Sequence, residues 1–161
     1  DSEFHAQISA LSKCYFYRLQ VGEVPNPFQQ RYSWQRKKPL NFSTLNDMAK
    51  AILGEHDFTS FQSQGTLVSS PVRKILISRW VEKPSGLLEY QIQGTGFLKQ
   101  MVRNLVGTMV KTHDNGGSDQ QIMEILEKKD RKWAPAPAPA QGLYLASVQY
   151  PKILDNKCRK L

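Results

Sequence analysis

Cysteine is scarce in this sequence. The 161 residues include two, Cys14 and Cys158, which lie far apart and form no Cys-x-x-Cys pair. This usage excludes a disulfide framework and a thiolate metal motif, and it fits a reduced, cytoplasmic setting. The three histidines, His5, His56 and His113, share no metal-ligand spacing, so we expect no metal site.

Long apolar runs and acidic residues are also lacking. There is no uninterrupted run of about 18 apolar residues, and no helix has a uniformly basic polar face, so we expect no membrane partner. Asp and Glu number 14 against 22 Lys and Arg, which makes the formal net charge +8. This imbalance favours a polyanionic partner, and nucleic acid is the leading candidate. A basic surface that is only solvated is the alternative.

The residues that are present predict one globular domain. With 40% hydrophobic and 22% charged residues, the chain is long enough to bury one sizeable core. Residue periodicity and turn signals predict strands at 10–22, 72–93 (a hairpin) and 142–151, and helices at 43–53, 97–113 and 118–129. This mixed order indicates an α+β domain with a mainly antiparallel sheet and the helices packed on one face.

Local signals predict how these segments begin and how they are joined. Ser43 is expected to cap the first helix, and Ser118 with Gln121 to form a capping box on the third. Residues 22–34 and 63–70 are expected to be loops. The segment RKWAPAPAPAQG, residues 131–142, predicts a stiff and mostly extended connector.

Arg103 stands in the middle of the apolar stretch GTGFLKQMVRNLVGTMV. At about 100° per residue, the apolar side chains of this helix sweep one broad arc, and Arg103 falls at its edge. Gly107 is expected to leave space beside Arg103, although a glycine inside a helix costs about 1 kcal/mol relative to alanine. Arg103 either extends to water along its apolar stem, or points into a cleft and holds a carboxylate or phosphate by a two-pronged contact.

Five stretches, at their present order and spacing, carry a resemblance to one family. They are FHAQISALSKCYFYRL, ILGEHDFTSFQ, SPVRKI, LLEYQIQGTGFLKQMVRNLVGTMV and APAQGLYLASVQYP. Together they resemble the carboxy-terminal half of the tRNA pseudouridine synthase A family, over nearly the whole chain. The resemblance implies the pseudouridine synthase catalytic fold and a cytoplasmic homodimer that isomerises uridine in the anticodon stem-loop of tRNA, at positions 38 to 40. It implies no metal and no organic cofactor.

The resemblance also implies half of an active site. The family's nucleophilic aspartate lies in a Gly-Arg-Thr-Asp segment of the amino-terminal half, and that segment is absent from this sequence. The sequence also opens without Met, so we expect that an amino-terminal domain with the catalytic aspartate is missing. Residues 1–151 are expected to form the carboxy-terminal α+β domain, and residues 152–161 a basic tail.

Three residues match the family's catalytic positions. Tyr15 matches a tyrosine that stacks under the target base and can act on the proton at C5, since a phenol offers both a ring and a hydroxyl. Arg103 matches the arginine that pairs with the catalytic aspartate, where a cation lowers the pKa of the carboxyl and fixes its direction. Leu143 matches a leucine that lines the pocket beneath the uracil. For Tyr15 and Leu143, an ordinary role in the core is the alternative.

Two further segments match regions of the family that contact tRNA. The first is Phe4, His5, Ala6, Gln7 and Ile8, and the second is Gly65, Thr66, Leu67, Val68 and Ser69. Gln7 replaces a more common arginine, which would remove a phosphate contact and weaken binding uniformly. The function implied is that of a tRNA pseudouridine synthase, inactive without its missing half. The alternative is a basic RNA-binding module that has the same fold and no chemistry.

Overall fold

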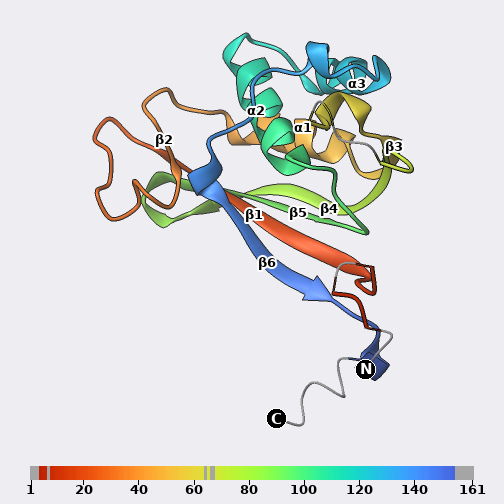
Figure 1. Ribbon diagram of the computed structural model, residues 1–161. Helices are drawn as coiled ribbons and strands as arrows, with labels where there is room; N and C mark the ends of the chain where they lie inside the picture. The colour runs from red at the N-terminus through yellow and green to blue at the C-terminus, as the bar shows by residue number, and fades with distance from the viewer. Residues whose placement is uncertain (1–3, 7, 64, 66–67, 155–161) are drawn as a thin grey trace.

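Strand β1 (Ser12–Val21) is the centre of the sheet, because three other strands pair with it. In the computed structural model, which describes residues 4–6, 8–63, 65 and 68–154, β5 pairs with β1 along one edge in the antiparallel sense. The other edge is shared, since antiparallel β6 covers residues 12–17 and parallel β2 covers residues 19–21. The sheet order is β2-β1-β5-β4-β3, with β6 beside β1 (Figure 1).

The remaining strands complete a mainly antiparallel sheet, in which the β1–β2 pair is parallel. Their bounds are β2 (Trp34–Arg36), β3 (Gly54–Asp57), β4 (Val72–Lys83), β5 (Leu87–Gly94) and β6 (Leu143–Gln149). Strands β4 and β5 form the predicted hairpin through a short 3-10 turn at Pro84–Gly86. Strands β2 and β3 were not predicted, because three or four residues carry too little alternation to be recognised.

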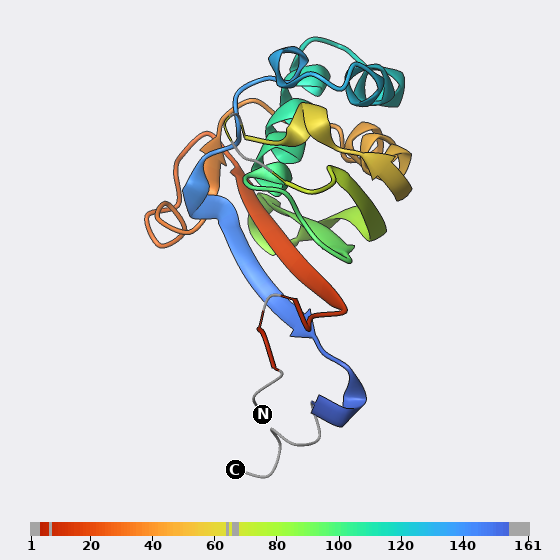
Figure 2. The same ribbon diagram turned by 45° about the vertical axis from the view of Figure 1, so that its right-hand side comes forward.

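The three α-helices all pack on one face of the sheet (Figures 1 and 2). They are α1 (Phe42–Ala51), α2 (Met101–Asp114) and α3 (Asp119–Glu127). Alternate residues of β1 and β5 point toward them and are fully buried, as Tyr17, Leu19, Tyr90 and Ile92 illustrate. The predicted α+β class, with a mainly antiparallel sheet and helices on one face, is confirmed.

The starts of the helices differ from the prediction. Asn41, not Ser43, caps α1, and its side-chain oxygen accepts a 3.0 Å hydrogen bond from the amide of Thr44. Ser118 precedes α3 but makes no side-chain capping bond, so the predicted capping box does not form. Helix α2 begins at Met101, four residues after the predicted start at Phe97, because Gln100 adopts a left-handed backbone conformation with φ of 61°.

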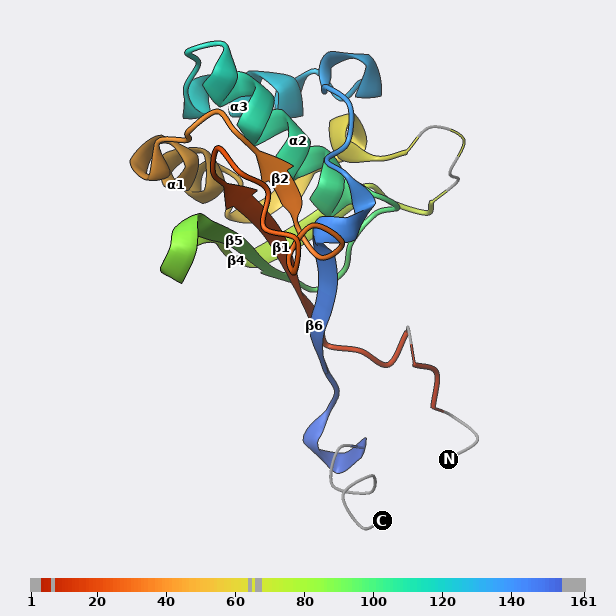
Figure 3. The same cartoon turned by 90° about the vertical axis from the view of Figure 1, so that its left-hand side faces the viewer.

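The Ala-Pro connector lies against α2, as Figure 3 shows for the segment that descends to β6. Gly107 makes this approach possible, since a Cβ there would lie 2.4 Å from the carbonyl oxygen of Ala136 and 2.9 Å from the amide of Ala138. The expectation that Gly107 leaves open space beside Arg103 was therefore wrong: the connector backbone fills that space. Two 3-10 turns, Arg131–Trp133 and Ala140–Gly142, flank the extended part.

No helix in the described part of the chain is both long enough and apolar enough to span a membrane.

Candidate active site

A cavity of about 470 Å³ opens where β1, β6 and the segment before α2 meet. Its aromatic and aliphatic walls come from all three elements, and its polar groups lie on β4 and on the residues just before α2. The lining residues are Tyr15, Val68, Arg73, Phe97, Leu98, Lys99, Gln100, Met101, Val102 and Leu143. Tyr15 and Leu143, which lie far apart in the sequence, therefore share one cavity.

Tyr15 forms one aromatic wall of this cavity. Its ring meets the ring of Phe97 edge to face, with the centroids 5.1 Å apart and the planes at 83°. The side chain is half-buried, and burial raises the pKa of its hydroxyl above the ordinary value of 10. Tyr15 is therefore protonated at neutral pH and offers a flat ring and a hydrogen-bond donor.

Leu143 stands at the first position of β6, directly opposite Tyr17 of β1. Tyr17 is fully buried, and its hydroxyl donates a 2.7 Å hydrogen bond to the carbonyl oxygen of Pro139. Burial raises the pKa of Tyr17, while the nearby charge of Arg103 opposes that shift. Tyr17 is thus a core residue that joins the connector to the sheet.

Arg103 lies on α2 beside the connector. Its Nε donates a 2.7 Å hydrogen bond to the carbonyl oxygen of Ala138, and the residue is half-buried. It does not line the cavity of Tyr15, although its helical neighbour Val102 does. Within the described residues Arg103 has no carboxylate partner, so its two terminal nitrogens are available for one.

A second arginine fixes the other end of the connector. Arg131 donates from Nη1 to the carbonyl oxygen of Ala134 and from Nη2 to that of Pro135, at 2.8 Å. Nη2 also lies 3.1 Å from the side-chain oxygen of Asn104, whose amide donates to the carbonyl oxygen of Phe61. Burial lowers the pKa of Arg131, yet an arginine remains charged at neutral pH.

Cationic and amide groups form the rim of the cavity, and sequence reasoning assigned them no role. Arg73 donates to the carbonyl oxygens of Ser70 and Val72, which holds its guanidinium at the cavity. Lys99 and Gln100 are exposed and precede α2 directly. The quoted stretches SPVRKI and GTGFLKQMVRN contain all three rim residues, but nothing local in them indicates that β4 and α2 converge here.

The segment predicted to contact tRNA at residues 4–8 lies beyond the start of β1 and the end of β6, and none of its described residues lines the cavity. Phe4 packs edge to face on Tyr150, whose hydroxyl donates a 2.8 Å hydrogen bond to the carbonyl oxygen of Ala6. The Nδ1 of His5 accepts a 3.2 Å hydrogen bond from the amide of Ile8, and Ile8 is 80% exposed. Gln7 lies outside the described residues.

The second predicted contact segment reaches the cavity at one point. Val68 lines it, whereas Gly65 and Ser69 are exposed. Thr66 and Leu67 lie outside the described residues. The exposed-loop prediction for residues 63–70 agrees with the residues that are described.

This arrangement can receive a flat, anionic group. Two aromatic rings and Leu143 provide stacking and apolar surface, and Arg73 and Lys99 provide positive charge at the rim. Among the described residues that line the cavity there is no carboxylate, imidazole or thiol. The cavity can therefore bind and orient a nucleotide, while a covalent nucleophile would have to come from elsewhere.

Comparison with known proteins connects this chain to one enzyme family. The sequence model of that family, described as tRNA pseudouridine synthase, matches residues 48–151. A protein of Bdellovibrio bacteriovorus called tRNA pseudouridine synthase A is 42% identical over 159 residues, covering 99% of this chain and 61% of the relative.

Other relatives with the same name show the same partial coverage. The protein of Bacillus subtilis is 38% identical over 150 residues, covering 93% of this chain and 60% of the relative. The protein of Pseudothermotoga lettingae is 35% identical over 150 residues, with coverage of 93% and 61%. The chain thus spans about 60% of the length of these relatives.

Proposed function

The chain belongs to the tRNA pseudouridine synthase family, and from this premise we propose that it supplies half of the active-site cleft of an enzyme that isomerises uridine to pseudouridine in the anticodon stem-loop of tRNA. In this reaction the bond from the ribose to the uracil nitrogen breaks, the base turns, and a bond from the same ribose carbon to C5 forms. The proton on C5 leaves, and the released nitrogen is protonated. No metal, organic cofactor or redox partner is required.

The observation that carries this proposal is the state of Arg103. This half-buried arginine, held at Nε by the carbonyl oxygen of Ala138, has no carboxylate partner for its two Nη groups in the described residues. Such a group is suited to bind a carboxylate of another part of the protein, through hydrogen bonds from both Nη groups. The carboxylate would be the catalytic aspartate of an amino-terminal half, kept ionised by the adjacent charge.

Tyr15 is proposed to stack against the target base after it has left the RNA helix. The edge-to-face contact with Phe97 supports this role, because it fixes the ring plane before any base arrives. The raised pKa of the hydroxyl makes Tyr15 a weak general base at neutral pH, so the stacking role is the better supported of the two. Leu143 is proposed to complete the apolar floor.

The predicted RNA contacts belong to the same proposal. Arg73 and Lys99 at the rim are placed to meet the phosphates that flank the target nucleotide, and Val68 would approach the base from the loop side. The segment of Phe4 to Ile8 would contact tRNA farther along β6. A homodimer and a cytoplasmic location are further parts of the proposal, taken from the family resemblance and from the reduced setting that the cysteine usage fits.

A basic RNA-binding module without chemistry remains the second candidate. The absence of a carboxylate from the described lining of the cavity favours it if the protein has no amino-terminal half. The relatives argue against it, since those that match nearly the whole chain are named tRNA pseudouridine synthase A. The Nη groups of Arg103 do not decide between the two candidates, because a guanidinium binds an RNA phosphate as well as a carboxylate.

The test measures pseudouridine formation on an unmodified tRNA transcript, with tRNA binding followed in the same samples. We expect this chain alone to bind tRNA without product, and a longer protein with an amino-terminal Gly-Arg-Thr-Asp half to form product. Product from this chain alone would show that one of its own carboxylates is the nucleophile. No product from the longer protein, with binding intact, would favour the RNA-binding module.

A further inference from the structure

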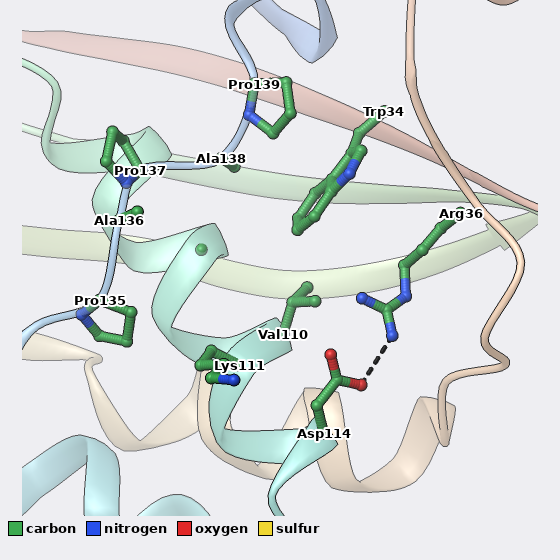
Figure 4. Close-up of a pocket in the computed structure, with 11 residues that line it drawn as sticks. Trp34, Arg36, Val110, Lys111, Asp114, Pro135, Ala136, Pro137, Ala138 and Pro139 are labelled. Carbon is green, nitrogen blue, oxygen red and sulfur yellow. Dashed lines mark hydrogen bonds and ion pairs between the residues drawn. The ribbon is translucent and has the colours of Figure 1, made fainter.

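A second cavity, of about 430 Å³, lies between β2, α2 and the connector (Figure 4). Helix α2 forms its floor at Gly107 and Val110, the connector forms one wall from Pro135 to Pro139, and Trp34 of β2 forms the opposite wall. The indole ring of Trp34 points into this space. The cavity therefore combines an aromatic face with an apolar floor, which is the surface that a planar ring requires.

Positive charge surrounds the mouth of this cavity. Arg36 lines it and donates a 2.6 Å hydrogen bond to Asp114, and Lys38 lies 3.4 Å from the same carboxylate. Lys111, which is exposed on α2, lines the cavity as well. Arg36 and Lys38 pair with the one carboxylate of the lining, Asp114, and Lys111 adds a third cation, so the local charge is positive and favours an anionic ligand.

The chain segment that carries Trp34 has the composition of a single-stranded RNA contact. Between Glu23 and Asp47 there is no acidic residue, whereas four cations are present: Arg31, Arg36, Lys37 and Lys38. Two further aromatic side chains of this segment are largely exposed, Phe28 at 84% and Tyr32 at 56%. Aromatic rings interleaved with cations bind unpaired nucleotides, because the rings stack on bases and the cations meet phosphates.

We propose that the cavity between β2, α2 and the connector receives an unpaired nucleotide of an RNA strand, with its base against Trp34 and its phosphates at Lys38 and Lys111. This inference rests on the proposed function, since it assigns a second contact for the same RNA beyond the cavity of Tyr15. An unpaired nucleotide fits better than a protein side chain for two reasons. The excess of cations would repel a basic side chain, and an aliphatic side chain would make no contact with these cations.

The connector links the second cavity to Arg103. Ala138 lines the second cavity, and its carbonyl oxygen is also the acceptor for Nε of Arg103. A nucleotide seated against Pro137 and Ala138 would press the connector onto α2, where it holds the guanidinium. RNA bound in the second cavity would thereby support the orientation of Arg103.

The test uses the intrinsic fluorescence of Trp34 with a short, unstructured oligouridylate. Stacking of a base on the indole should quench the emission as the oligonucleotide binds. Of the other two tryptophans, Trp80 is buried and Trp133 is 58% exposed near Lys128. We expect the quenching to disappear in Trp34→Phe and to persist in the matched control Trp133→Phe. Quenching that disappears in the control instead would overturn the proposal.

Affinity provides a second measurement that does not depend on fluorescence. Trp34→Ala should weaken oligonucleotide binding at least about fivefold, which corresponds to the loss of one stacked base. Lys111→Ala should flatten the dependence of log affinity on log salt by about 0.7, as expected for one phosphate contact with a single strand. Lys50→Ala, an exposed lysine of α1 that does not line the cavity, should leave the slope unchanged. Unchanged affinity in a Trp34→Ala variant that is folded would overturn the proposal.

The solution mass separates RNA from a protein partner. If Trp34→Phe or Trp34→Ala shifts the chain from dimer to monomer without changing oligonucleotide affinity, the cavity is an interface between copies and the proposal fails. The outcome is also separable from the proposed enzymatic function. If the longer protein forms no pseudouridine while Trp34 is still quenched by RNA, the result counts against the proposed enzymatic function. If the longer protein forms pseudouridine but substitution of Trp34 changes neither quenching nor affinity, the result counts against this cavity alone.

Discussion

Arg103 and Ala138 are joined by two hydrogen bonds in opposite directions. The Nε of Arg103 donates to the carbonyl oxygen of Ala138 at 2.7 Å, and the amide of Ala138 donates to the carbonyl oxygen of Arg103 at 3.0 Å. The connector is thereby locked to α2 at the residue whose guanidinium is proposed to meet the catalytic carboxylate. Because this bond occupies Nε, only an end-on contact through the two Nη groups remains for that carboxylate.

Gly107→Ala tests the close approach of the connector to α2. Alanine favours a helix by about 1 kcal/mol over glycine, but the new Cβ would lie 2.4 Å from the carbonyl oxygen of Ala136. Displacing backbone costs more than the helical gain, so we expect the free energy of unfolding to fall by about 1–3 kcal/mol. Chemical denaturation measures it. A more stable variant would show that the connector can move away without cost.

Arg103→Lys tests the end-on contact, in a longer protein that contains the amino-terminal half. Lysine carries the charge but cannot bond Ala138 and a carboxylate in the same geometry. We expect tRNA affinity to stay nearly unchanged and turnover to fall at least about tenfold. Single-turnover kinetics and tRNA binding are the measurements.

Arg79→Lys is the matched control for that substitution. Arg79 is exposed on β4 and donates from Nε to the side chain of Gln91, at 3.0 Å. Lysine there should leave turnover unchanged. Equal rates in Arg103→Lys and the unsubstituted protein would remove the proposed role of Arg103.

The sequence predicted correctly those elements that depend on residues close together along the chain. Strand β1 and the hairpin of β4 and β5 follow the predicted alternation, and the α+β class follows from their order. The start of α2 could not be found in this way, because the apolar period continues back to Phe97. In the structure Phe97 turns away to pack on Tyr15, and Gln100 breaks the helix with a φ of 61°.

The candidate site was predictable only in part, for the same reason. The family resemblance placed Tyr15 and Leu143 at one site, and both line one cavity. Arg73 reaches that cavity from a different strand, and its contribution depends on how β4 meets the segment before α2. The acceptor of Arg103 lies 35 residues away in the connector. The connector can lie this close to α2 because Gly107 has no side chain, and no local sequence pattern indicates that contact.

Asn41→Ala and Ser43→Ala form a matched pair that tests the cap of α1. Asn41 accepts the amide of Thr44, whereas Ser43 is already inside the helix. We expect Asn41→Ala to lower the free energy of unfolding by about 1 kcal/mol. Ser43→Ala should be neutral or slightly stabilising, because alanine is the better helix former. The reverse ranking in denaturant titrations would restore Ser43 as the cap.

Tyr17→Phe and Tyr15→Phe separate a structural hydroxyl from a proposed catalytic one. Tyr17→Phe leaves the carbonyl oxygen of Pro139 without its donor, so we expect a loss of about 1–2 kcal/mol in unfolding free energy. Tyr15→Phe keeps the ring against Phe97 and should leave stability nearly unchanged. If turnover of the longer protein also survives Tyr15→Phe, Tyr15 acts as a stacking surface only. A large loss would assign chemistry to its hydroxyl.

Asp114→Asn tests the ion pair that joins the end of α2 to β2. Burial alone would raise the pKa of Asp114, but the hydrogen bond and charge of Arg36, together with Lys38, outweigh it and lower the pKa. A carboxyl whose pKa is lower in the folded state stabilises the fold when the pH is above its pKa in the unfolded chain, near 3.8. This stabilisation is lost as the pH falls through the pKa of the folded state.

We therefore expect Asp114→Asn to lower the free energy of unfolding by about 1–3 kcal/mol at neutral pH, where a charge-assisted bond is lost. The difference between the two proteins should shrink as the pH falls from the unfolded pKa through the lower folded pKa, because Asp114 then becomes protonated in the folded original protein as well. Denaturant titrations from pH 7 downward measure this convergence. A difference that stays constant with pH would show that the contact stabilises through packing rather than charge.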